Sequence, residues 1–239
     1  MSHLVSNRKI AANLIMSVLA QIISIVVSFI LGFVVPKYID EFQYSYWQTF
    51  ILYVGYVGVF HFGLLDGIVL RYSQYDFDEL DKPRVRSQFQ LLLTFNSILT
   101  LIGCIVSAFL FDIVTKEIVI LVSIGVITKN IFTYTSYSFQ ITNRITKYAV
   151  LVIAQRAAYA LFVVFLLACR VNDFYWYCIA DLFGDVFGIF LGAIFNRGMY
   201  FGKGIPIKEC LKECWINVSA GIMLMVANFS SSLLVGGAK

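Results

Sequence analysis

The chain has 239 residues, of which 60% are apolar and 13% are charged. A soluble domain carries roughly 25% charged residues because its surface must face water, and half that share cannot coat a soluble globule of this length. The formal net charge is +4, but the basic residues lie between apolar runs and form no continuous patch. Composition therefore excludes a soluble globule and a nucleic-acid-binding protein, and it indicates an integral membrane protein.

Long apolar runs follow one another along the chain, and crossing a bilayer takes about 20 such residues as a helix. The backbone amides must be bonded within each segment, so each run is expected to be helical. The expected spans are Ala11–Val35, Trp47–Leu70, Phe89–Phe111, Ile118–Ile141, Ala149–Ala168, Phe174–Phe195 and Ile216–Val235. The first run exceeds the ~7–15 apolar residues of a signal peptide, so we expect it to remain in the protein as a membrane anchor. The sequence predicts an all-α, polytopic transmembrane helical bundle.

Lysine and arginine are divided unevenly between the two sides of this predicted bundle. The side of the N-terminus carries 12 of them: Arg8, Lys9, Arg71, Lys82, Arg84, Arg86, Arg144, Lys147, Arg197, Lys203, Lys208 and Lys212. The opposite side carries 3: Lys37, Lys116 and Arg170. Cytoplasmic loops are enriched in these residues, so the N-terminus is expected in the cytoplasm and the chain in the plasma membrane. Tyr46 and Trp47 are expected at the membrane interface, where aromatic side chains gather.

The stretch before the last span is amphipathic. Pro206 suits the first position of a helix, and apolar residues then recur at helical spacing up to Trp215. This helix either lies on the cytoplasmic membrane surface or packs against its own bundle. We therefore expect a six-helix transmembrane lobe at 1–195, an amphipathic connector at 196–215 and the first helix of a second lobe at 216–239.

A possible internal repeat points the same way. The stretch Ile15–Gln21 lines up with Ile222–Asn228, with three identities and an amide opposite an amide. If the repeat is real, the last span begins a second, equivalent lobe. The chain is then expected to be part of a longer protein.

Ionisable residues inside the predicted spans each need a reason to be there, because charge is costly in a bilayer. Lys129 lies about midway along the fourth span, with Asn130 next to it. Lys129 either faces an internal cavity, where it meets an anionic head group, or forms an ion pair that fixes the bundle. Arg156 is placed either to reach the interface or to hold phosphate oxygens bidentately.

Asp181 and Asp185 are four residues apart, so they share one face of the sixth span. Such a pair suits proton or sodium coupling in a transporter, or else it provides ion-pair partners for Lys129 and Arg156. Asp66 is better explained by a structural role near the interface, and His61 by packing with a hydrogen bond.

Catalytic motifs are missing from the sequence. The run Asp66–Arg71 resembles the opening of the alcohol phosphatidyltransferase motif, but the aspartates that should follow are absent. Cys210 and Cys214 have no second pair that would complete a zinc site. We expect no enzymatic activity, no cofactor and no metal.

The opening of the chain and its second and last spans resemble a known family. Arg8, Lys9 and Asn13 precede a long first span that contains Gln21. The second span ends with FGLLDGIVLRY at 62–72, and ECWIN at 213–217 enters the last span. These stretches resemble the N-terminal half of Wzx-like polysaccharide flippases of the multidrug/oligosaccharidyl-lipid/polysaccharide superfamily. The glycine usual in the first external loop of that family is absent from residues 40–46.

The resemblance implies two six-helix lobes around a central cavity that opens to either side of the membrane in turn. Its cargo would be an oligosaccharide linked to a polyprenyl diphosphate, moved among the membrane lipids for cell-surface polysaccharide synthesis. Substrate-binding residues would then be Lys129, Arg156 and Asn130, and Asp181 and Asp185 would couple transport to H⁺ or Na⁺. The alternatives are a cation-coupled small-molecule (multidrug) exporter and a non-transporting membrane scaffold of polysaccharide synthesis.

Overall fold

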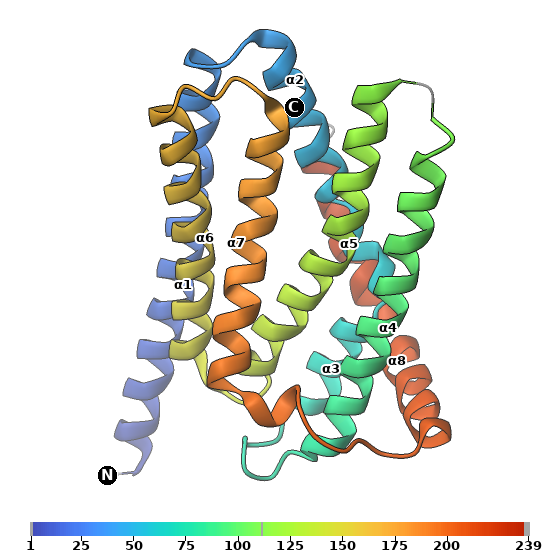
Figure 1. Cartoon of the computed structure of the whole chain (residues 1–239). Coiled ribbons are helices and arrows are strands. Elements are labelled where there is room, and N and C mark those ends of the chain that lie inside the picture. The colour runs from blue at the N-terminus through green and yellow to red at the C-terminus, as the bar shows by residue number, and fades with distance from the viewer. Residues whose placement is uncertain (1, 111, 237–239) are drawn as a thin grey trace.

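A computed structural model describes residues 2–110 and 112–236, and every regular element in them is a helix (Figure 1). The long helices are α1 (Ser2–Val34), α2 (Glu41–Val54), α3 (Leu64–Tyr72), α4 (Lys82–Ser107), α5 (Ile113–Gln140), α6 (Ile145–Ala168), α7 (Phe174–Phe195) and α8 (Ile207–Gly236). Three short 3₁₀ segments join them: η1 (Val35–Lys37), η2 (Val57–His61) and η3 (Arg197–Met199). The all-α fold class is confirmed.

Aspartates begin three of these helices. Asp81 accepts a hydrogen bond from the Arg84 amide at the start of α4, and Asp173 accepts one from the Tyr175 amide at the start of α7. At the start of α5, Asp112 accepts a bond of 2.7 Å from the Thr115 amide, and hydrogen bonding to Thr115 lowers the pKa of this carboxyl. Such caps satisfy amides that have no partner inside the helix.

Six helices within the described residues are long and apolar enough to cross a membrane, or seven if one bent pair counts as a span. The six are Ile15–Lys37, Lys82–Ser107, Ile113–Gln140, Ile145–Ala168, Phe174–Phe195 and Ile207–Ser231. Large apolar side chains such as Leu101 and Phe190 are exposed on the outside of the bundle. Outward apolar surface on long helices is what a lipid environment requires. The chain is a multi-pass membrane protein.

The second span is not the continuous helix expected over Trp47–Leu70. It consists of α2, η2 and α3. The part formed by α2 and η2 is bent by 58° relative to α3. The bend lies at Phe62 and Gly63, whose φ angles of 50° and 79° are both left-handed. A left-handed pair ends a right-handed helix, and glycine adopts that conformation without the cost of a Cβ. Counting apolar residues does not detect such a break.

The amphipathic stretch and the last span form one helix, α8. Its apolar positions Cys210 and Cys214 are buried in a cluster with residues of α3 and α4, including Leu65 and Val85. This cysteine face packs against the bundle, whereas the apolar side chains of Ile207, Leu211 and Trp215 on the same helix are exposed. The residues between α7 and α8 are fastened to α4, because Arg86 donates hydrogen bonds to the carbonyls of Gly198 and Lys203.

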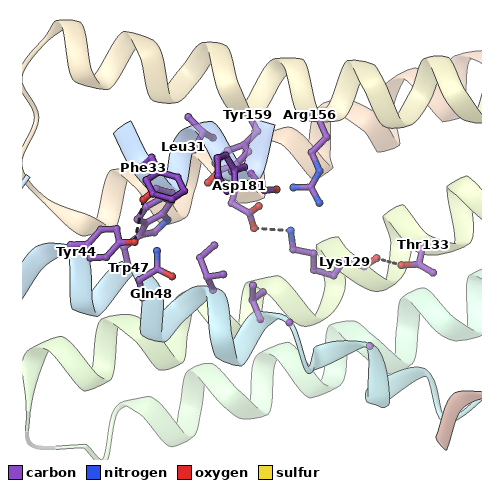
Figure 2. A pocket seen from close by; sticks show the side chains of 17 residues that line it. Leu31, Phe33, Tyr44, Trp47, Gln48, Lys129, Thr133, Arg156, Tyr159 and Asp181 are labelled. Atoms are coloured by element: carbon purple, nitrogen blue, oxygen red, sulfur yellow. Dashed lines mark hydrogen bonds and ion pairs between the residues drawn. The ribbon is translucent and has the colours of Figure 1, made fainter. Parts of the chain in front are cut away.

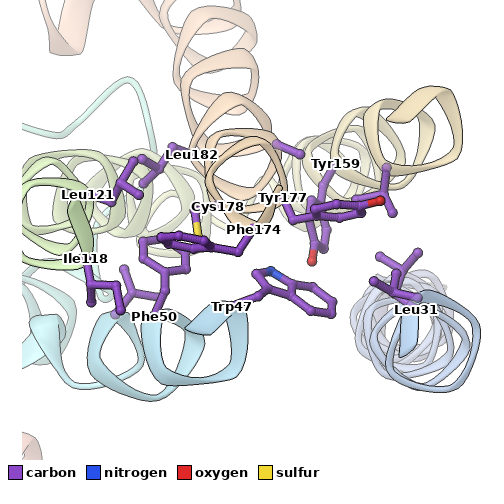
Figure 3. Packing of buried hydrophobic residues seen from close by; sticks show 14 of the residues in the cluster. Leu31, Trp47, Phe50, Ile118, Leu121, Tyr159, Phe174, Tyr177, Cys178 and Leu182 are labelled. Carbon is purple, nitrogen blue, oxygen red and sulfur yellow. The ribbon is translucent and has the colours of Figure 1, made fainter. Parts of the chain in front are cut away.

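Three hydrophobic clusters hold the described part of the bundle together. The largest joins α1, α2, α5, α6 and α7 near the end opposite the chain's N-terminus (Figures 1 and 3). Leu31, Trp47, Phe50 and Tyr177 pack there. Trp47 is 2% exposed, so its indole faces the interior of the bundle and not the lipid. Ring contacts with Tyr44 of α2 and Tyr177 of α7 hold it there.

Candidate functional site

A buried ion-pair group crosses from α5 to α7. The Lys129 ammonium lies 2.6 Å from an oxygen of Asp181 and 2.8 Å from an oxygen of Asp185. The two aspartates stand one turn apart on α7, as their spacing predicts, so a single cation reaches both. Gln155 on α6 donates a hydrogen bond of 2.9 Å to the other oxygen of Asp185. Three helices thus meet at these side chains.

A cavity of about 680 Å³ opens beside this group, between α1, α2, α5, α6 and α7. Lys129, Arg156 and Asp181 line it and point toward the same space from three different helices (Figure 2). Asp185 lies behind them with 1% of its side chain exposed. The sequence predicted charged residues for such a cavity, and three of the five proposed site residues line this one.

Arg156 differs from Lys129 in having no contact ion pair among the described residues, although its charge acts on Asp185. No hydrogen bond or ion pair reaches its guanidinium from the described part of the chain. A second cavity of about 410 Å³ meets the first at this side chain, and Gln21, Ser24 and Ser28 of α1 line it. Arg156 therefore stands where the two cavities join, with its hydrogen-bond donors available to a ligand.

The electrostatics of the group follow from these pairs. Lys129 and Arg156 supply two positive charges, and Asp181 and Asp185 supply two negative ones, so the four ionised side chains sum to zero. Lys129 holds both carboxylates, and the net charge of −1 on these three side chains is offset by Arg156. The guanidinium N–H groups have no acceptor among the described residues, and they face the cavity. A guanidinium in such a place binds an anion strongly, because its fork of N–H groups matches carboxylate and phosphate oxygens.

The Asn130 side chain contacts different helices from those that the neighbouring Lys129 contacts. Its amide donates hydrogen bonds of 2.8 Å to Asn96 on α4 and 3.3 Å to the carbonyl of Val57 in η2. It is fully buried and is not among the residues that line the cavity. The structure thus separates Asn130 from Lys129 and Arg156 and places it against the broken span.

The remaining polar residues of the second span form a separate group. His61 and Asp66 approach to 3.8 Å at the break, and His61 Nδ1 accepts a hydrogen bond from the Gly63 amide. Arg71, further along α3, pairs with Glu213 of α8 at 3.2 Å. None of these side chains lines the charged cavity. His61 and Asp66 connect the start of α3 to the break in the second span, and Arg71 and Glu213 connect α3 to α8.

Sequence reasoning missed residues of α1 and α2 that line the cavity. Ser28 and Gln48 have no charge, and Trp47 was interpreted as an interfacial aromatic. An amide side chain inside an apolar run is a signal that was available for Gln48, because it too needs a partner inside a membrane. Which face of α2 meets the cavity is decided by packing.

Among the described residues, no group of three His, Cys, Asp or Glu side chains is arranged to hold a metal ion. Comparison with protein-family models, with curated proteins and with solved structures found no match for this chain. The fold and the composition define its class, a multi-pass α-helical membrane protein with a charged cavity among its helices.

Proposed function

We propose that this protein is a membrane transporter that moves a polyprenyl-diphosphate-linked oligosaccharide across the bilayer. The observation that carries the proposal is the half-buried Arg156 guanidinium, which faces a cavity inside the bundle and makes no hydrogen bond or contact ion pair to any described residue. A cation placed inside a membrane bundle is costly, and a purely structural role would repay the cost with direct contacts. A diphosphate would supply the missing partner and bind the guanidinium bidentately.

Lys129 and its two carboxylates suit a coupling role in the same cycle. A cargo anion that draws Lys129 away would release Asp181 or Asp185 from its counter-charge. A released carboxylate in a low dielectric takes up H⁺ or Na⁺ to recover that charge. Cargo binding and cation binding would then favour one another.

Two other functions fit the geometry less well. A scaffold needs no open cavity and would pair all its buried charges internally, whereas Arg156 is left without such a pair. An exporter of cationic drugs would keep carboxylates free for its cargo, whereas Lys129 holds both. Anionic cargo is the better match for these charges.

Binding tests the site first, with the protein in lipid nanodiscs and inorganic pyrophosphate titrated by calorimetry. We expect saturable binding that weakens at least about tenfold in Arg156→Gln, the loss of one charge-assisted contact. Arg197→Gln, an exposed arginine in η3, is the matched control and should bind like the unaltered protein. Equal binding by Arg156→Gln, or none by any form, would overturn the assignment.

Transport is tested in proteoliposomes with a fluorescent, short-chain polyprenyl diphosphate carrying a disaccharide. A membrane-impermeant reductant quenches the dye in the outer leaflet and so reports how fast the lipid changes sides. We expect faster exchange than in protein-free liposomes, and loss of that gain in Arg156→Gln and Lys129→Gln. Exchange that these substitutions leave unchanged would contradict the proposed cargo.

A further inference from the structure

One face of α2 brings uncharged polar and aromatic groups to the same cavity. Tyr44, Trp47, Gln48 and Ile51 recur at helical spacing, and all four line it. Figure 2 shows Tyr44, Trp47 and Gln48 grouped at one end of the cavity, with Lys129 and Arg156 toward the other. The cavity therefore has two ends of different chemistry.

The polar groups at the α2 end have unused hydrogen-bonding capacity. The Gln48 amide makes no hydrogen bond to any described residue. The indole N–H of Trp47 is buried and has no acceptor. A buried polar group without a partner costs about 1–3 kcal/mol, and the indole N–H normally finds an acceptor when it is buried. The buried indole N–H and the half-buried Gln48 amide lie on one wall of the cavity, and together they point to a ligand that supplies the partners.

Aromatic rings surround these groups on both sides. Trp47 packs edge-on against Tyr44, with ring centroids 5.8 Å apart. On the α1 side, Phe29 and Phe33 line the cavity, and their rings are 4.5 Å apart. Figure 3 shows the Trp47 indole lying across the space between α2 and α1. Apolar faces combined with a few oriented polar groups are typical of small-molecule sites.

We propose that Gln48 and Trp47 form a neutral subsite that binds the hydroxyl groups of a sugar ring, with the aromatic rings packing against its C–H faces. This inference rests on the proposed function, because it assigns the sugar and the diphosphate of one cargo to opposite ends of one cavity. An amide both donates and accepts, so it pairs with a hydroxyl in either role. No charge is needed at this end.

Trp47 itself reports on the subsite. The variant Trp176→Phe/Trp215→Phe leaves Trp47 as the only tryptophan, and both replaced side chains are exposed. In nanodiscs we titrate it with chitotriose, a neutral trisaccharide, and record the tryptophan emission. We expect a saturable change whose affinity falls about tenfold in Gln48→Leu, as the loss of hydrogen bonds predicts. Thr49→Val, the next residue on α2 and not part of the cavity lining, should leave it unchanged.

Pyrophosphate separates failure of this inference from failure of the proposed function. Gln48→Leu should bind pyrophosphate normally, which also shows that the variant is folded, and Arg156→Gln should bind chitotriose normally. Pyrophosphate binding without any response to chitotriose would overturn the sugar subsite and leave the proposed function standing. A chitotriose response that Gln48→Leu does not weaken would also overturn the subsite. If the unaltered protein does not bind pyrophosphate, the proposed function itself is overturned.

Discussion

Two neighbouring residues of α5 show how one step along a helix changes the role of a side chain. Lys129 meets Asp181 and Asp185 beside the cavity, and Asn130 meets Asn96 and the carbonyl of Val57. Successive residues of an α-helix point about 100° apart, so they contact different neighbours. The expectation that both bind substrate treated them as one site, and packing assigns them to two.

Replacing Asn130 with leucine should therefore destabilise the fold without changing the ligand site. Asn130→Leu leaves the Asn96 side-chain oxygen and the Val57 carbonyl buried without their donor. We expect a loss of about 2 kcal/mol, from the cost of stranding buried acceptors. Thermal unfolding in nanodiscs should show a lower midpoint, while the folded protein keeps its affinity for pyrophosphate.

Ser97→Ala is the control for this substitution. Ser97 follows Asn96 on α4, is exposed, and donates only to the carbonyl of Leu93 in its own helix. Its replacement should leave the midpoint nearly unchanged. A pyrophosphate affinity that falls in Asn130→Leu at an unchanged midpoint would restore Asn130 to the substrate site.

At the scale of elements, the close crossing of α3 and α8 is the feature that composition does not reveal. A Cβ on Gly67 would overlap the backbone of Asn217, and a Cβ on Gly221 would overlap the backbone at Gly63. The two helices approach this closely because glycines face each other, as small residues allow in membrane bundles. Arg71, paired with Glu213, fastens the same crossing at one end.

Adding one methyl group at the crossing should force the helices apart. Gly67→Ala puts a Cβ against backbone that cannot turn away, unlike a flexible side chain. We expect a loss of about 2 kcal/mol, as for overpacked interiors, measured as a lower unfolding midpoint in nanodiscs.

Gly32→Ala is the matched change, since no atom lies within 4 Å of the added Cβ in that helix. Its midpoint should stay the same or rise, because alanine favours a helix more than glycine does. Similar losses in both variants would mean that helix propensity, and not the α3–α8 contact, sets the effect.

At the scale of the whole molecule, the fold gathers the basic connections at one end. The α3–α4, α5–α6 and α7–α8 connections lie at the end where the N-terminus lies, and the α1–α2, α4–α5 and α6–α7 connections lie opposite (Figure 1). Lys82, Arg144 and Arg197 stand at the first end, as the count along the sequence predicts. This segregation favours an orientation with the N-terminus in the cytoplasm.

Cysteine labelling tests that orientation. In a cysteine-free background, we expect an impermeant maleimide to label Lys37→Cys and Phe109→Cys on intact cells. It should label Gln74→Cys and Lys203→Cys only after the membrane is permeabilised. All four positions are exposed, so access depends on the side of the membrane alone. The reverse pattern would invert the proposed orientation and, with it, the direction in which cargo enters.

The site was predictable only in part. The shared face of Asp181 and Asp185 follows from a spacing of four residues, and the structure bears that relation out. Lys129 and Arg156 were marked by their charge in apolar runs, and both line the cavity. Gln48 and Trp47 were not marked: the amide of Gln48 was a signal that charge alone overlooks, and an aromatic residue on an apolar helix carries no sign of the face it occupies.

Six of the seven expected spans follow from the sequence alone, since about 20 apolar residues are required wherever a chain crosses the hydrocarbon. The break at Phe62 and Gly63, the union of the connector with the last span, and the pairing of Lys129 with both aspartates were decided by the tertiary structure. In helices apolar on every side, periodicity does not distinguish a face turned to lipid from one turned to a neighbour. Close packing between helices makes that choice, and with it places Arg156 in the cavity.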